Sequence, residues 1–143
     1  MASRARADEV ERLLSAARDW AAARADVVAL ALVGSWARGA AREGSDVDLV
    51  VLSDDPATYT RGDDWIASLA PSATLVRSGD WGAIREQRLR LASGLELEVG
   101  VGRPSWACVC PLDAGTRRVV RDGLRVLYDP RGLLSALVAA AVP

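Results

Sequence analysis

The chain has 143 residues, of which 50% are hydrophobic, and a formal net charge of −1. This is the size of one domain with its own core, so we expect a single domain over residues 1–143. All 18 basic residues are arginine and they are spread along the chain, which predicts no broad nucleic-acid surface. Because histidine and lysine are absent, His-based triads, Schiff-base lysines and the Walker A lysine are excluded.

The sequence contains no segment typical of membrane insertion or export. No apolar run reaches the roughly 20 residues that cross a bilayer, and residues 1–12 carry alternating charges where a signal peptide has an apolar core. We therefore expect a cytoplasmic protein without a membrane partner. Cys108 and Cys110 lack the two further ligands that a structural zinc site needs, so we interpret them as small residues of a strand or turn.

Hydrophobic periodicity predicts an alternation of helices and strands. Apolar residues every three to four positions indicate helices, aliphatic runs indicate strands, and clusters of Gly, Pro, Asp and Ser indicate turns. The expected elements are an amphipathic helix within 7–24, a buried strand at 27–33, a short helical turn at 35–41, a buried strand at 46–52, a helix from Asp63 or Asp64 to just before Pro71, strands at 74–76, 86–91, 95–101 and 124–128, and a last helix opened by Asp129 and Pro130. The segment 86–91 is also compatible with a helix. This order predicts an α/β or α+β fold, a central mixed β-sheet flanked by helices.

Two carboxylates within an apolar strand indicate a cation site. Asp46 and Asp48 are spaced i, i+2, so both project from one face of a strand while Val47 and Leu49 pack on the other. Like charges held close together repel, and burial of either would raise its pKa, so a bound cation is the simplest way to neutralise them. Two Mg²⁺ ions fit between such oxygens.

Gly34 and Ser35 lie upstream, where the first strand gives way to the expected helical turn. Glycine allows a phosphate to approach the backbone closely, and free N–H groups at the start of a helix bind anions. Arg38 is placed one turn further, where it would add a charge-assisted contact to a phosphate oxygen. Each feature alone is more commonly structural: a turn, an exposed strand edge, a solvated arginine. Their order, with ten residues between Ser35 and Asp46, favours one joint site.

The combination resembles the signature of the DNA polymerase beta-like nucleotidyltransferase superfamily. That signature is a hydrophobic residue, Gly, then Gly or Ser, a spacer, and finally Asp, hydrophobic, Asp or Glu, hydrophobic. Val33-Gly34-Ser35 and Asp46-Val47-Asp48-Leu49 meet it. The longer form Gly-Ser-x-Ala-Arg-Gly…Ser-Asp-x-Asp-Leu, which includes Arg38 and Ser45, is similar to the minimal nucleotidyltransferases of bacteria and archaea. The resemblance covers roughly the first 100 residues.

The resemblance implies metal-dependent transfer of a nucleoside monophosphate, expected to be AMP from ATP, to a hydroxyl of a small molecule or protein, with release of pyrophosphate. Two Mg²⁺ ions, or Mn²⁺ in their place, would be bound by Asp46, Asp48 and a third acid. The residues implied in nucleotide binding are Gly34, Ser35, Arg38 and Ser45. On this basis we expect Gly34→Val to weaken nucleotide binding far more than it alters the metal site.

The third acid is expected in the strand at 95–101, which offers Glu96 and Glu98 on one face. Both fit the pattern of hydrophobic, acid, hydrophobic. Glu98 lies mid-strand without a cationic neighbour in sequence, whereas Glu96 is nearer the turn at Gly94. A mid-strand acid has the greater need of a metal, so we predict Glu98 as the catalytic acid, with Glu96 as the alternative ligand.

The acceptor and the assembly stay open at this stage. Larger relatives carry additional nucleic-acid-binding or helical domains, so the acceptor site is expected to be open, or completed in a homo-oligomer. The alternative function is an antitoxin or regulatory module that acts mainly by binding a partner protein. Intact acids and an intact Gly34-Ser35 favour catalysis.

Overall fold

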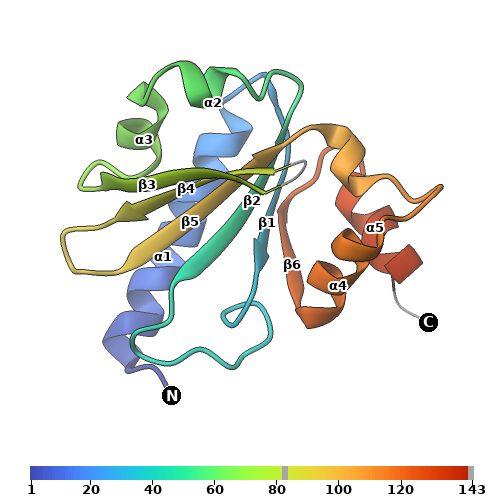
Figure 1. The fold of residues 1–143 in the computed structure, drawn as a ribbon. Helices are drawn as coiled ribbons and strands as arrows, with labels where there is room; N and C mark the ends of the chain where they lie inside the picture. The colour runs from blue at the N-terminus through green and yellow to red at the C-terminus, as the bar shows by residue number, and fades with distance from the viewer. Residues whose placement is uncertain (82–83, 142–143) are drawn as a thin grey trace.

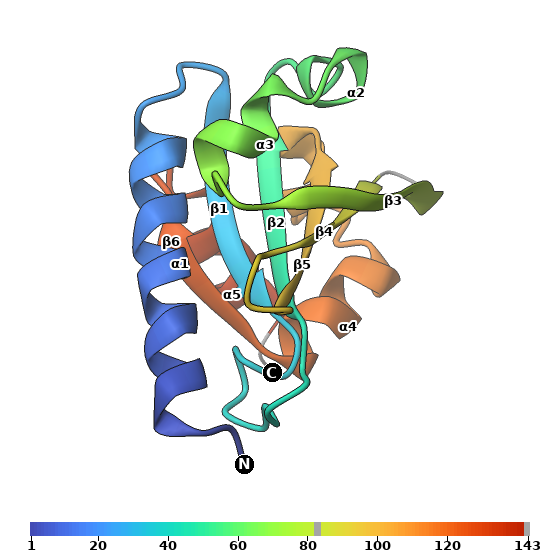
Figure 2. The same ribbon diagram turned by 90° about the vertical axis from the view of Figure 1, so that its left-hand side faces the viewer.

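A six-stranded mixed β-sheet with helices on both faces forms the protein (Figures 1 and 2). The structure is a computed structural model, and it describes residues 1–81 and 84–141. The strands are β1 (Val27–Val33), β2 (Val47–Ser53), β3 (Thr74–Trp81), β4 (Ile84–Arg90), β5 (Glu96–Gly102) and β6 (Leu124–Tyr128). The helices are α1 (Arg4–Ala22), α2 (Thr58–Arg61), α3 (Asp64–Leu69), the 3₁₀ helix η1 (Pro104–Ala107), α4 (Ala114–Asp122) and α5 (Leu133–Ala141).

The strand order is β3-β4-β5-β2-β1-β6, and it places the two acid-bearing strands side by side at the centre. β2 and β5 pair in parallel, whereas the other neighbours pair antiparallel. In this register Asp48 lies opposite Glu98, and Glu98 lies opposite Arg88 of β4. Asp48 and Glu98, which are 50 positions apart in sequence, therefore meet on the same face of the sheet.

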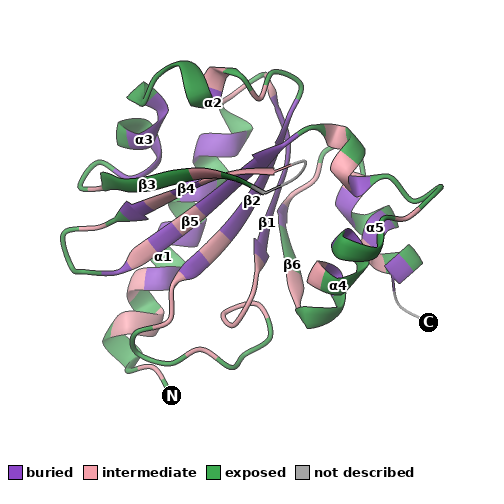
Figure 3. Cartoon of the chain, in the orientation of Figure 1, coloured by how far each residue is buried: buried purple, intermediate pink, exposed green. Residues whose placement is uncertain are grey.

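Most residues of β1 and β2 are buried (Figure 3). The period of two along the central strands divides their side chains between two cores. Val47, Leu49 and Val51 of β2 pack towards α1 and α3, together with the alternate apolar residues of β5. The apolar stripe of α1 completes this core: Val10, Leu13, Leu14, Ala17, Trp20 and Ala21. Val50 and Leu52 project to the other face, where they pack with residues of η1, α4 and α5.

The second face is covered unevenly. The helices α4 and α5 contact β1 and β6, and η1 contacts β2. In Figure 1 these helices lie to the right of β6, apart from β3 and β4. The acidic ends of β2 and β5 consequently lie on a face that helices cover only in part. No helix in the described part of the chain combines the length and hydropathy of a membrane span.

The expected α/β fold with a mixed sheet is confirmed, and the apolar run Val27–Val33 is a strand over its whole length. The segments 74–76 and 86–91 belong to a longer hairpin, β3 and β4, so the helical alternative for the second segment was wrong. Residues 35–39 form hydrogen-bonded turns and not a helix. Two α-helices and the 3₁₀ helix η1 were not predicted: α2 and η1 are single turns, and α4 carries three arginines and few apolar residues, which obscures its period.

Trp20 of α1, Tyr59 of α2 and Trp65 of α3 form a buried aromatic cluster, and Tyr59 gives a prediction for stability. The Tyr59 side chain is fully buried; its hydroxyl donates to Asp26 Oδ2 at 2.6 Å and accepts from Arg24 Nε at 3.0 Å. Tyr59→Phe should lower the free energy of unfolding by about 1–3 kcal/mol, because it removes two hydrogen bonds to half-buried charged partners, although Asp26 Oδ2 keeps the bond from Ser53 Oγ. Urea unfolding measures this. Tyr128→Phe is the control, and an equal loss in both variants would contradict the role of the Tyr59 hydroxyl.

Candidate active site

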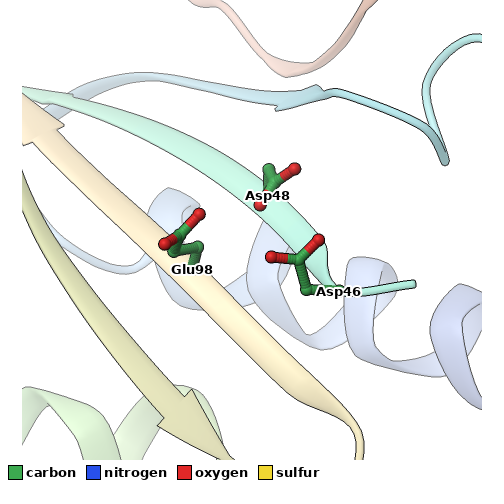
Figure 4. A group of neighbouring side chains, drawn as sticks. All are labelled: Asp46, Asp48 and Glu98. Carbon is green, nitrogen blue, oxygen red and sulfur yellow. The ribbon is translucent and has the colours of Figure 1, made fainter. Parts of the chain in front are cut away.

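Three carboxylates converge at the centre of the partly covered face (Figure 4). Asp46 directly precedes β2, Asp48 lies in β2 and Glu98 in β5, and one oxygen from each lies within 4.8 Å of the others. The period of two places Asp46 and Asp48 on the same side, and the parallel register brings Glu98 beside Asp48. Within the described residues, this is the cluster of acids that could hold a metal ion.

Of the three acids, Asp48 is the one whose charged form the rest of the protein stabilises least. Burial raises the pKa of Asp48 to about 8, and the charges of Asp46 and Glu98 add to the effect. Its Oδ1 atom is buried and has no hydrogen-bond partner in the described part of the chain. A buried, unpartnered carboxylate oxygen costs free energy unless a ligand satisfies it. This oxygen is therefore suited to bind a cation.

Arg88 of β4 forms ion pairs with the other two acids. Its Nη2 atom donates to Asp46 Oδ2 at 3.0 Å and to Glu98 Oε1 at 2.7 Å. Nη1 donates to Glu96 Oε1 at 2.9 Å. Burial opposes the charge of the guanidinium, but the charge of Glu98 and the bonds to the acids raise the pKa of Arg88 above its usual range. Arg88 thus holds the side chains of Asp46 and Glu98 in place.

Glu96 and Glu98 have different surroundings although they share a face of β5. Glu96 accepts from Arg88 and also from Arg90 Nη2 at 2.8 Å, and these bonds lower its pKa. Glu98 lies within the acidic cluster and Glu96 outside it. The expectation that Glu98 lacks a cationic neighbour holds only in sequence, because in space Arg88 and, at 3.6 Å, Arg77 reach it. Its assignment as the third ligand stays a prediction.

Gly34 is required by the acid beside it. It has φ +79°, and a Cβ atom at this position would lie 2.5 Å from Asp48 Oδ2. A valine side chain would therefore meet the carboxylate of Asp48 directly. The expectation that Gly34→Val would largely spare the metal site was wrong, since β1 and β2 are adjacent and Val33 pairs with Asp48.

The loop after Gly34 forms one hydrogen-bonded turn. The N–H groups of Ala37 and Arg38 donate to the Gly34 carbonyl, and Gly39 closes the turn with φ +73°. Arg38 is exposed and donates from Nη1 to the Asp122 carbonyl at 3.5 Å, so the structure does not bring it to the acids. Ser45 closes the loop: its Oγ accepts from the N–H of Arg42. Ser35 is half-buried beside Gly34.

Gly34 and Gly39 both have positive φ but different surroundings, so they allow a matched test. Gly34→Ala and Gly39→Ala should each cost about 1–2 kcal/mol of stability, because both glycines have positive φ. Only Gly34→Ala should weaken Mn²⁺ binding in calorimetry, since Gly39 has open space where a Cβ would lie. Equal Mn²⁺ affinities in the two variants would show that Gly34 does not shape the acidic cluster.

Two cavities adjoin the cluster, and Glu98 lines both. The larger, about 580 Å³, extends below Glu98 between the sheet and the segment formed by η1 and α4. The smaller, about 210 Å³, lies over β3 and β4 and is lined by Arg77, Asp80 and Glu86 among others. Burial and the nearby charge of Glu98 raise the pKa of Glu86. The acidic cluster thus has room for ligands on both sides.

The residues present fit a divalent cation. Carboxylate oxygens are the ligands that Mg²⁺ and Mn²⁺ prefer; oxygens from Asp46, Asp48 and Glu98 converge, and Asp48 also has a buried oxygen without a partner among the described residues. Cys108 and Cys110 are free and exposed thiols in the loop after η1.

Sequence reasoning missed Arg88, Glu86 and Trp106 as neighbours of the site. The alternation of Glu86, Arg88 and Arg90 around the buried Leu89 does indicate one charged strand face. However, only the pairing of β4 with β5 shows which acids that face meets. Trp106 lies in a short 3₁₀ helix that has no periodic signal.

Comparison with known proteins identifies similar sequences and folds. Residues 12–101 match the sequence model of the nucleotidyltransferase domain family. No curated protein sequence matches the chain. A solved structure of the Cid1 poly(U) polymerase, with Mg and 3′-dATP bound, superposes with a TM-score of 0.52 and 21% identity, covering 70% of this chain and 32% of that one.

Two further solved structures match with similar coverage. Cid1 in complex with its short product ApU gives a TM-score of 0.51 and 20% identity, covering 70% of this chain and 32% of that one. Terminal uridylyl transferase 4 from Trypanosoma brucei, with bound UPU, gives a TM-score of 0.46 and 19% identity over 80% of this chain and 37% of that one. The chain spans about a third of the length of the proteins in these structures. The Cid1 similarity concerns the fold.

Proposed function

Because the chain belongs to the nucleotidyltransferase domain family, we propose that it transfers a nucleoside monophosphate from an NTP to an acceptor hydroxyl and releases pyrophosphate. The observation that carries this proposal is the convergence of Asp46, Asp48 and Glu98, in which one buried oxygen of Asp48 lacks a partner. A buried carboxylate oxygen without a partner is costly for the fold, and a bound cation would offset that cost.

Asp46, Asp48 and Glu98 would hold the Mg²⁺ ions that the family implies. When bound, the ions supply charge stabilisation for the oxygens of the α-phosphate, the entering hydroxyl and the leaving pyrophosphate. The absence of histidine and lysine from the sequence is compatible with this chemistry, since the protein's task is mainly to position charges.

The chain's own residues would orient the reactants. Gly34 and Ser35 follow β1 and lie next to Asp48, and their backbone would hold the leaving pyrophosphate. Arg88 would keep Asp46 and Glu98 oriented through its bonds to both and to Glu96. Glu98 faces the smaller cavity, from which the acceptor hydroxyl would approach.

Membership of the family indicates an NTP donor and an acceptor, but it does not identify either of them. ATP is the donor implied by the minimal nucleotidyltransferases, whereas the Cid1 structures are described in terms of UTP selectivity. We propose ATP with a small-molecule or protein acceptor. UTP is the competing donor, and the experiment below includes it.

The purified protein should be incubated with each α-³²P-labelled NTP, Mg²⁺ or Mn²⁺, and panels of hydroxyl-bearing small molecules and proteins. Release of pyrophosphate with a mass gain of one nucleotide on an acceptor is the expected result. Asp48→Asn protein is the control for contaminating activity. The proposal fails if no NTP yields more pyrophosphate with the wild-type protein than with this variant.

A further inference from the structure

The residues that line the larger cavity beside Glu98 differ from those that usually bind phosphate groups. It measures about 580 Å³, within the range of pockets that bind small molecules. Its walls include Val33, Ile84, Trp106 and Val119. The polar side chains among the described lining residues are carboxylates and hydroxyls, and no arginine is among them. This lining suits an uncharged, largely apolar group that also carries hydroxyls.

The direction of the cavity follows β5 away from the acids. Glu98, Gly100 and then Trp106, after the end of the strand, lie along it. Gly100 has no side chain that would narrow the cavity: a Cβ atom there would lie 2.9 Å from Cγ2 of Ile84. A ligand anchored at the acidic cluster could therefore extend over Gly100 to the side chain of Trp106.

The geometry of the proposed reaction would direct the nucleoside into the larger cavity. In an in-line displacement the entering and leaving oxygens lie on opposite sides of the α-phosphorus. Along the row of paired residues, Val33, Asp48, Glu98 and Arg88 follow one another across the sheet from β1 to β4. With pyrophosphate over the Gly34 end of this row, the acceptor approaches from the β4 end. The nucleoside is attached to the same phosphorus, so it must extend along the strands, perpendicular to this row. The larger cavity lies in that direction.

We propose that the larger cavity binds the nucleoside half of the NTP, with Trp106 as the wall on which the base stacks and Glu86 as an acceptor for a ribose hydroxyl. This assignment rests on the proposed nucleotidyl transfer. Stacking of a base on an aromatic side chain contributes substantially to nucleotide binding without depending on hydrogen bonds. A carboxylate is a suitable acceptor for a ribose hydroxyl.

The walls of this cavity come partly from outside the family-matched region. The match ends at residue 101, whereas Trp106 in η1, and Thr116 and Val119 in α4, follow it. Asp113 also lines the cavity, but its Oδ2 accepts from the N–H of Thr116 as the cap of α4. The segment 104–119 would thus adapt a common catalytic sheet to the nucleoside that this protein uses.

Binding of nonreactive probes tests the assignment without turnover. Calorimetry with Mg²⁺ should compare the α,β-methylene analogues of the four NTPs with inorganic triphosphate. We expect the wild-type protein to bind one analogue more tightly than triphosphate. Trp106→Ala should weaken that analogue about tenfold or more and leave triphosphate unchanged, while Trp106→Phe retains most of the affinity.

A second variant guards against unfolding, because Trp106 is half-buried and packs against the core under α5. Val119→Trp fills the cavity from α4 and should produce the same selective loss. If the wild type binds the analogue no better than triphosphate, or if both variants keep the difference, the nucleoside does not occupy the cavity and transfer itself can still stand. If the wild type binds neither probe, the proposed function fails together with this inference.

Discussion

Asp48→Asn is expected to abolish nucleotidyl transfer, with turnover at least about a thousandfold lower, or about 4 kcal/mol of barrier. Asp48 is the acid whose oxygen has no protein partner, so its charge is the one that a bound ion would compensate most fully. Asparagine keeps the shape of the side chain but removes that charge. The radiolabel assay with saturating Mg²⁺ measures the effect.

The same substitution should stabilise the metal-free protein. The folded-state pKa of Asp48, about 8, lies above its ordinary value of 3.8, so the folded protein retains a proton that the unfolded chain releases. The free energy of unfolding therefore falls as the pH rises between these two values. The lowered pKa values of Glu43 and Glu96 act only below their ordinary value of 4.5, where stability is lost on acidification. The window from pH 5 to 8 thus reports on Asp48, with Glu86 contributing near its lower end.

Thermal unfolding across pH 5 to 8, with and without Mn²⁺, separates these effects. The wild type should lose stability towards pH 8 in chelator and regain it with Mn²⁺, whereas Asp48→Asn should give a flatter profile and little response to the ion. Asp54→Asn is the control, because Asp54 forms an exposed ion pair with Arg131 at 2.9 Å. A wild-type profile as flat as that of Asp48→Asn would contradict the burial of an unpaired charge.

Local pattern was sufficient to predict the central strands and the two aspartates. An aliphatic run predicts a buried strand whatever its partners are, and the i, i+2 spacing of Asp46 and Asp48 fixes their common face. The fold class followed from the alternation of helices and strands. These features depend on residues that are close in sequence.

What could not be predicted depends on register and on partners distant in sequence. Arg88 meets Asp46, 42 positions away, only because β4 pairs with β5 and β5 with β2. The carboxylate of Asp48 on the next strand leaves no room for a side chain at Gly34, which also has a positive φ. The wall formed by η1 and α4 follows a loop that sequence periodicity does not describe. The sequence therefore offered Gly34, the two aspartates and Glu98 as candidates, but not the residues of β4 nor the wall formed by η1 and α4.

Glu98→Gln is expected to lower turnover by about three orders of magnitude, whereas Glu96→Gln should lower it by less than about tenfold. Glu98 contributes an oxygen to the cluster with Asp46 and Asp48, and glutamine would offer a neutral and weaker ligand. Glu96 instead binds Arg90 and one nitrogen of Arg88. Without Glu96, Arg88 still bonds to Asp46 and Glu98, so the acids stay oriented.

Mn²⁺ affinity distinguishes a ligand from a residue that acts through Arg88. Glu98→Gln should weaken Mn²⁺ binding in calorimetry at least about tenfold, because a charged ligand is lost. Glu96→Gln should change it little, since the cluster keeps its three acids. Arg90→Gln provides the matched control: Arg90 bonds to Glu96 alone among the acids of this strand, so it should reproduce the small effect of Glu96→Gln. A silent Glu98→Gln beside an inactive Glu96→Gln would reverse the assignment and make Glu96 the third ligand.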